Sequence, residues 1–168
     1  MVRSLTQGSL TQGLLAAGTL GMIVLAVGCP GSTPPPPEED VIFPADYRAS
    51  FTLVRDCRNS TEHSATIRVW VNDIGAEGYL ADVSPLPEGT IVVKEEFVAG
   101  APCDSDADLV RWSSMRKEPA GFDEAGSDWR FQEVAAPARH ITKDSNATCL
   151  GCHTAEACIP RDLMCTVP

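Results

Sequence analysis

Five consecutive residues near the C-terminus, Cys149 to His153, form the pattern C-x-x-C-H. Two thiols at this spacing can each bond to one vinyl group of a haem, and the histidine that follows can bind its iron. The pattern therefore predicts one covalently attached haem c, with Cys149 and Cys152 as the thioether residues and His153 as the proximal metal ligand. This constrains the fold, because the rest of the chain has to supply a pocket for the cofactor.

Other interpretations of these cysteines stay open. The chain has 7 Cys and 3 His, so Cys149 and Cys152 could instead form ordinary disulfides in a lipoprotein without haem. A zinc site is a further alternative, although the sequence lacks the second C-x-x-C pair that a four-ligand site commonly uses.

The N-terminal segment predicts export and lipidation. A single basic residue, Arg3, precedes an apolar run over residues 14–27 that is too short and too glycine-rich for a membrane span. The run ends in Leu-Ala-Val-Gly-Cys at residues 25–29, which resembles a bacterial lipobox. We therefore expect residues 1–28 to be a lipoprotein signal peptide and Cys29 to be lipidated. An uncleaved anchor or a plain secretory signal is the alternative.

A proline-rich acidic linker follows the lipidated cysteine. Residues 29–40 contain four consecutive prolines and then two glutamates and an aspartate, which favour an extended, solvated spacer. Residues 41–168 are then long enough for one haem domain. Pro30 is not the aspartate that commonly retains lipoproteins at the inner membrane. We expect a protein of the bacterial cell envelope, anchored in the lipid bilayer through Cys29, at the outer membrane and facing the periplasm.

The remaining cysteines are even in number, as expected in an oxidising compartment. They are Cys57, Cys103, Cys158 and Cys165. Three pairings are possible. We favour Cys57 with Cys103 and Cys158 with Cys165, because the last two lie seven residues apart in a short tail beyond the haem motif.

The net charge of the chain limits the classes of partner that it is expected to bind. The chain has 13 Lys and Arg against 23 Asp and Glu, a formal net charge of −10. This acidity argues against nucleic acid and anionic membrane surfaces. It fits a solvated secreted surface or, alternatively, docking of a basic redox partner protein.

The apolar pattern predicts mainly strands. Residues 65–72 alternate, with Ile67, Val69 and Val71 on one face and Arg68 and Trp70 on the other. The other expected elements are strands over residues 90–98, 109–116 and 129–134, a helix or turn over 73–82 and an opening helix over 47–55. The predicted fold class is α+β, mainly antiparallel β-sheet with a few short helices and a C-terminal haem-attachment turn, stapled by disulfides.

Six short segments carry a resemblance to a known family. They are Tyr47-Arg48, residues 67–72, residues 87–95, residues 115–117, residues 126–129 and the C-x-x-C-H motif. In this order they resemble the cytochrome P-460 family, which is related to β-type cytochrome c′. The resemblance implies an antiparallel sheet, a possible homodimer and one five-coordinate c-type haem. Some members of that family oxidise hydroxylamine, whereas others bind NO or CO.

The resemblance also implies site residues. Lys94 matches the lysine that hydroxylamine-oxidising members cross-link to the porphyrin edge. A strand lysine buried beside a haem can lose its proton and act as a nucleophile. The alternative is a solvent-facing lysine paired with Glu95 or Glu96. Arg68 is the candidate for the family's distal arginine and for hydrogen bonding to a bound ligand, with a surface arginine as its alternative.

One departure from the family argues against hydroxylamine oxidation. The place of the distal carboxylate falls near Trp112, with no acid until Glu118. Without a general base near the iron, oxidation of a protic nitrogen substrate slows. Trp112 and Phe97 could instead form a hydrophobic distal wall suited to apolar gases, or simply belong to the core.

Four residues are alternative sixth iron ligands, which would make the protein an electron carrier. They are His63, Met115, His140 and Met164. Our main expectation is a periplasm-facing c-type haem protein with redox or small-nitrogen-ligand chemistry on hydroxylamine or NO. An electron-transfer or gas-binding cytochrome and a haem-free disulfide lipoprotein are the alternatives. Whether the protein is an enzyme, as a haem-dependent oxidoreductase, stays open.

Overall fold

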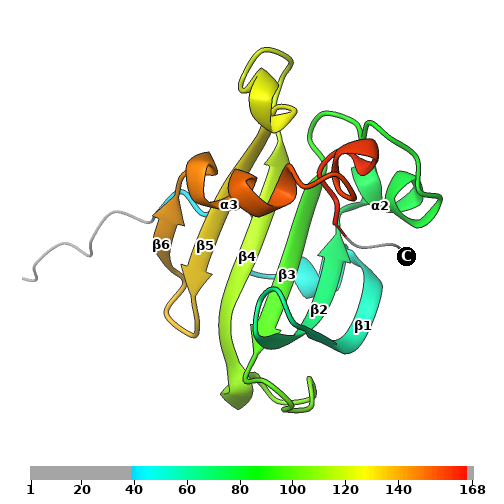
Figure 1. Cartoon of the computed structure of the whole chain (residues 1–168). Helices are drawn as coiled ribbons and strands as arrows, with labels where there is room; N and C mark the ends of the chain where they lie inside the picture. Colours follow the sequence, from blue (N-terminus) through cyan, green and yellow to red (C-terminus); the bar gives the residue numbers. More distant parts are fainter. Residues whose placement is uncertain (1–38, 166–168) are drawn as a thin grey trace, which may run out of the picture. The chain divides into compact units, whose positions relative to one another are not determined.

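Six antiparallel strands form one sheet in which each strand pairs with its neighbours in sequence, as the computed structural model shows (Figure 1). The strands are β1 (Thr52–Ser60), β2 (Ala65–Val71), β3 (Ile91–Phe97), β4 (Leu109–Lys117), β5 (Trp129–Ala135) and β6 (His140–Asp144). The structure describes residues 39–165. The predictions for the signal peptide, Cys29 and most of the linker therefore lie outside the described residues.

Short helices surround the sheet. They are α1 (Tyr47–Ser50), α2 (Asp73–Leu80) and α3 (Asn146–His153), with single 3₁₀ turns at Asp106–Asp108, Glu124–Gly126 and Ile159–Arg161. The predicted fold class, a mainly antiparallel sheet with a few short helices and disulfides, is confirmed. In the described part of the chain, no helix has the length and apolar character needed to cross a bilayer.

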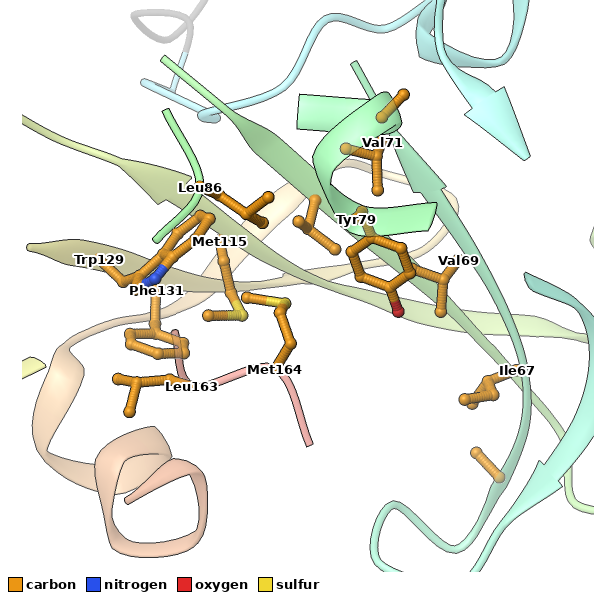
Figure 2. Packing of buried hydrophobic residues seen from close by; sticks show 13 residues of the cluster. Ile67, Val69, Val71, Tyr79, Leu86, Met115, Trp129, Phe131, Leu163 and Met164 are labelled. Atoms are coloured by element: carbon orange, nitrogen blue, oxygen red, sulfur yellow. The ribbon is translucent and has the colours of Figure 1, made fainter. Parts of the chain in front are cut away.

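The two faces of the sheet bury different sets of residues, because successive side chains on a strand point to opposite sides. We call one the helix face; it carries Ile67, Val69 and Phe131 and is covered by α2, α3 and the C-terminal segment (Figures 1 and 2). The other, the N-terminal face, carries Val93 and Val134 and is covered by residues 41–51. The alternation predicted for residues 67–71 is confirmed.

Both edge strands differ from the predictions. The opening helix predicted over residues 47–55 ends at Ser50, and residues 52–60 form β1 instead. β1 is exposed along most of its length, with polar residues on both sides. β6 was not predicted, and its residues are also mainly exposed. Edge strands are held by backbone pairing with one neighbour, so their sequences need no apolar alternation.

The last two residues of the predicted linker contact the sheet. The backbone carbonyl of Asp40 accepts a hydrogen bond from Gln132 Nε2 at 2.8 Å, and the Glu39 carboxylate contacts His140 at 2.5 Å. Ile42 N donates to Gln132 Oε1 at 2.9 Å. Within the described residues, Glu39, Asp40 and Ile42 therefore link the N-terminal segment to β5 and β6.

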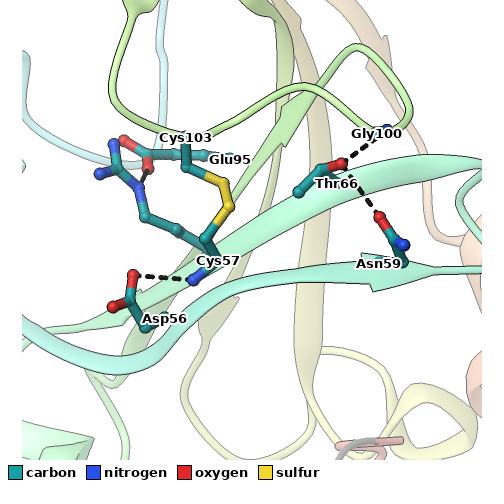
Figure 3. The surroundings of a disulfide bond; sticks show 8 residues. Asp56, Cys57, Asn59, Thr66, Glu95, Gly100 and Cys103 are labelled. Atoms are coloured by element: carbon teal, nitrogen blue, oxygen red, sulfur yellow. Dashed lines mark hydrogen bonds and ion pairs between the residues drawn. A yellow bond between two sulfur atoms is a disulfide. The ribbon is translucent and has the colours of Figure 1, made fainter.

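The two favoured disulfides are confirmed. Cys57–Cys103 ties β1 to the loop after β3, and Cys158–Cys165 closes a loop beyond α3. Beside the first bond, Thr66 Oγ1 accepts a hydrogen bond from Gly100 N at 2.9 Å and bonds to Asn59 at 3.2 Å (Figure 3). The loop after β3 is thus held to β1 and β2 by covalent and polar contacts.

Candidate functional site

The C-x-x-C-H residues occupy the C-terminal half of helix α3. Asn146 anchors the start of this helix to β5, donating from Nδ2 to the Trp129 carbonyl at 2.8 Å and accepting from Phe131 N at 3.1 Å. Residues three apart in a helix lie on the same side, one turn apart. Cys149 and Cys152 meet this condition, and both are free thiols, half-buried and exposed respectively.

The imidazole of His153 is held in place by a ring contact and a hydrogen bond. Its ring packs edge-on against Phe131 at 5.2 Å, and Nδ1 donates to the Leu163 carbonyl at 2.8 Å. Nε2 is then the nitrogen that can bind a metal. Burial lowers the pKa of His153, although the bond to Leu163 opposes this; the charges of Lys94 and His63 lower it further. The ring is thus favoured in its neutral, metal-binding form.

These groups fit a c-type haem. Two free thiols one helical turn apart can form the thioether bonds, and the adjacent neutral imidazole can supply the iron ligand. Within residues 39–165, no group of three or more His, Cys, Asp or Glu side chains is arranged as a metal-ion site.

Lys94 extends from β3 on the helix face. Its pairing partners are Val69 on β2 and Ser113 on β4. Its Nζ lies 2.5 Å from Nε2 of His63, which sits in the turn between β1 and β2. On the other side of the imidazole, Nδ1 lies 3.1 Å from Glu96 Oε1. Lysine, histidine and carboxylate therefore form a continuous row of contacts.

Glu96 is a buried carboxylate, 1% exposed, on the same face as Lys94. Besides His63, it accepts from Ser113 Oγ at 2.5 Å and from Arg111 Nε at 2.7 Å. Burial alone would raise the pKa of Glu96, but the hydrogen bonds from His63 and Ser113 and the charge of Lys94 lower it to about 2. The carboxylate is therefore ionised at neutral pH.

The amine of Lys94 is close to losing its proton. Burial lowers the pKa of Lys94 to about 8, against the opposing effects of Glu96 and Cys149. Lys94 also interacts electrostatically with His153. Lys94 therefore lies on the sheet face that the attachment helix covers, as a haem-edge role requires. The alternative of a solvent-facing lysine does not match this burial.

Arg68 lies on the N-terminal face, opposite Lys94. Its Nε donates to Glu95 Oε2 at 2.7 Å, and its guanidinium stacks 5.2 Å from the Phe97 ring. Glu95 is fully buried and also contacts Tyr47 and Arg48. The sheet therefore separates Arg68 from any ligand near Lys94. In this structure Arg68 compensates the buried charge of Glu95, and its contact with a bound ligand stays a prediction.

The two aromatic residues expected to form a hydrophobic distal wall also lie on the N-terminal face of the sheet, opposite Lys94. Trp112 and Phe97 belong to the core beneath the N-terminal segment, where Trp112 Nε1 donates to Tyr47 Oη at 2.9 Å. A shift of one residue in strand alignment moves a side chain to the other face. Trp112 and Ser113 are neighbours in sequence, yet only Ser113 lies on the face of Lys94.

Sequence reasoning missed Arg111 as a site residue. It considered Glu96 only as a partner of a solvent-facing Lys94 and His63 only as an alternative sixth iron ligand, and placed neither in a row of contacts with Lys94. Glu96 could have been found, because residues two apart on a strand share a face and Lys94 was already a candidate. His63 had no such signal, since its position depends on how the β1–β2 turn folds over β3.

The four residues considered as alternative sixth iron ligands contact other protein groups in this structure. Both ring nitrogens of His63 contact Lys94 and Glu96. His140 is exposed and contacts Glu39. Met115 and Met164 are buried in the helix-face core (Figure 2).

A model of the family Cytochrome P460 matches residues 44–163, which include Lys94, Glu96 and the whole C-x-x-C-H motif. Comparison with curated proteins finds no match. The match covers most of the chain and every residue of the site built above. The chain therefore belongs to the cytochrome P460 family, whose members are c-type haem proteins.

Proposed function

We propose that the protein carries one haem c, bound through Cys149 and Cys152 with His153 on the iron, and performs redox chemistry on a small nitrogen compound such as hydroxylamine or NO. The observation that carries this proposal is the row of Lys94, His63 and Glu96 on the sheet face that α3 also covers. Family membership supports the haem and sets aside the haem-free lipoprotein.

The polar character of this face favours a protic nitrogen substrate over an apolar gas. When bound, the haem supplies an iron that can hold a nitrogen ligand and accept its electrons. Oxidation of hydroxylamine also needs a proton acceptor. His63, oriented by the ionised Glu96, supplies such a group. The aromatic wall that would suit a gas pocket lies on the opposite face.

Lys94 is the residue proposed to meet the porphyrin edge. With a pKa of about 8, roughly one amine in ten is neutral at pH 7, against about one in three thousand for an unperturbed lysine. Only the neutral amine is a nucleophile. Its burial and its electrostatic interaction with Cys149 support cross-linking as in the hydroxylamine-oxidising branch of the family.

The visible spectrum tests this proposal. The full chain, matured with haem, is compared in oxidised and reduced forms with Lys94→Ala and with the control Lys143→Ala, which removes an exposed lysine paired with Glu133. We expect a strongly red-shifted reduced band in the wild type and the control that is lost in Lys94→Ala. An ordinary c-type spectrum in all three would contradict the role of Lys94 and favour an electron-transfer or gas-binding cytochrome.

A separate experiment tests whether the haem is covalently attached at Cys149 and Cys152. In a denaturing gel stained for haem, the wild type should retain haem in the protein band, and a Cys149→Ser, Cys152→Ser double variant should lose it. Retention of haem in the double variant would contradict thioether attachment at these residues.

We also propose that Cys29 is lipidated and anchors the protein at the outer membrane, facing the periplasm, where a basic redox partner protein could dock and a homodimer could form. The two disulfides support an oxidising compartment. Cys29→Ser should move the protein from the membrane fraction to the soluble periplasmic fraction. An unchanged membrane fraction would contradict lipid anchoring through Cys29.

A further inference from the structure

Glu96, His63 and Lys94 come from two strand positions and a turn, yet they form a single line of contacts. Glu96 Oε1 lies 3.1 Å from His63 Nδ1, and His63 Nε2 lies 2.5 Å from Lys94 Nζ. We propose that these residues form a proton relay: Glu96 orients His63, and His63 accepts the proton that Lys94 loses before its amine attacks the haem edge. The relay rests on the proposed function, because that function supplies the electrophile.

Hydrogen bonding sets the direction of the relay. An ionised carboxylate only accepts hydrogen bonds, so the Nδ1 atom of His63 that faces Glu96 carries a proton. In the neutral imidazole, Nε2 is then the unprotonated acceptor, and Nε2 is the nitrogen that faces Lys94. The orientation of Glu96 is itself fixed by Ser113 at 2.5 Å and Arg111 at 2.7 Å.

His63 is the group placed to take this proton. The charged or titratable groups that interact with the amine from neighbouring elements are Glu62, His63, Glu96, Arg111, Cys149 and His153. Of these, Glu96 lies 3.9 Å from Nζ, beyond ordinary hydrogen-bond distance, whereas His63 lies within it. Burial weakens the hold of Lys94 on its proton.

The proposed cross-linking of Lys94 to the haem is a two-electron oxidation. The ammonium of Lys94 loses one proton to His63. Joining the neutral amine to a porphyrin carbon then forms one C–N bond and breaks one N–H and one C–H bond. The two protons and two electrons released would reduce one molecule of the oxidant, hydrogen peroxide, to two molecules of water.

The experiment uses the full chain matured with haem and compares wild type with His63→Gln and Glu96→Gln. His140→Gln is the matched control, because it removes an exposed histidine that contacts Glu39. The first measurement is the fraction of Lys94 found in haem-bearing tryptic peptides at fixed times after addition of hydrogen peroxide. The second is the rate at which unjoined Lys94 is acetylated by acetic anhydride between pH 6 and 9, with the exposed Lys143 as an internal reference.

We expect both measurements at pH 7 to fall at least about tenfold in His63→Gln and Glu96→Gln, a lower bound on the roughly 10²- to 10⁴-fold that general-base assistance contributes. Both should stay within about twofold of wild type in His140→Gln. Glu96→Gln separates the relay from simple electrostatics. If Glu96 acted only as a countercharge, its removal would lower the pKa of Lys94 further and acetylation at pH 7 would become faster.

Unchanged or faster reaction in either relay variant would overturn the relay. If wild-type Lys94 never joins the haem, the cross-link in the proposed function fails, while the acetylation profile still decides the relay. His63 lies in a partly exposed turn, so His63→Gln retains a folded protein in which this comparison can be made.

Discussion

The Nδ1 atom of His153 donates a hydrogen bond to the carbonyl oxygen of Leu163 over 2.8 Å. Leu163 and the residue before it, Asp162, have φ angles of +67° and +53°, which residues other than glycine seldom adopt. The Asp162 carboxylate holds this conformation by accepting from Lys117 Nζ at 2.6 and 2.8 Å and from Leu86 N at 3.0 Å. The orientation of the predicted iron ligand therefore depends on an ion pair between β4 and the C-terminal loop.

Replacing Lys117 with methionine should be strongly destabilising. Asp162 is 4% exposed, and removal of one partner from a buried pair leaves an uncompensated charge, at a cost of about 3 kcal/mol. Urea unfolding of the full chain measures this loss. Lys143→Met, which breaks an exposed pair with Glu133, should cost under about 1 kcal/mol. Equal losses in the two variants would contradict the assigned role of Lys117.

Arg68→Gln should lower stability without changing the haem spectrum. The substitution removes one of the two arginines that compensate buried Glu95, while Arg48 and the Tyr47 hydroxyl remain. We expect a loss of roughly 1 to 3 kcal/mol in the free energy of unfolding. The oxidised and reduced spectra should match those of the wild type, since Arg68 lies on the face opposite Lys94. A shifted spectrum in a fully folded variant would reopen a ligand-binding role.

The two disulfides should contribute unequally to stability. Cys57–Cys103 spans 46 residues and Cys158–Cys165 spans 7. Loop-closure entropy then predicts contributions of about 4 and about 2 kcal/mol. Paired Cys→Ser variants, compared by urea unfolding, test this order. The reverse order would show that the C-terminal clip stabilises the native state by more than loop closure.

Acid stability should depend on Glu96. Its pKa of about 2 in the folded protein lies below the ordinary value of 4.5, so the unfolded chain binds more protons between these values. The stabilisation by Glu96 is therefore complete above about pH 4.5 and is lost as pH falls towards 2, by roughly 3 kcal/mol in all. Glu96→Gln should flatten the dependence of unfolding free energy on pH between 5 and 2.5. The exposed control Glu88→Gln should keep the wild-type slope; equal slopes in all three proteins would refute the assignment.

Gly75→Ala should destabilise the contact between α2 and Thr90, the residue before β3. A Cβ atom at residue 75 would lie 2.2 Å from Thr90 Cγ2, and Thr90 is fully buried. We expect a loss of about 2 kcal/mol from overpacking, measured by thermal or urea unfolding. The equivalent change in the same helix, Gly78→Ala, meets only the side-chain end of Leu86 at 3.0 Å and should cost less. A larger loss at Gly78 would contradict this packing argument.

Much of the central fold could be predicted because its signals are local. The period-two pattern of Ile67, Val69 and Val71 identified β2 and its buried face, and the strands predicted over residues 90–98, 109–116 and 129–134 correspond to β3, β4 and β5. β1 and β6 carried no such pattern, because an exposed edge strand is held by pairing with one neighbour. The disulfide pairing was predicted because Cys158 and Cys165 lie seven residues apart, which leaves Cys57 to pair with Cys103. The structure confirms both pairs.

The sequence by itself determined the haem-attachment motif, the family resemblance and the candidacy of Lys94, because each depends on residues close together in the chain or on their order. Only the tertiary structure decided which groups surround that lysine. The register between β2, β3 and β4 put Glu96 and Ser113 on its face and Arg68 and Trp112 on the other, and the β1–β2 turn brought His63 to it across 31 positions of sequence. A one-residue difference in strand register exchanges these faces, and no local pattern specifies where a turn will fold.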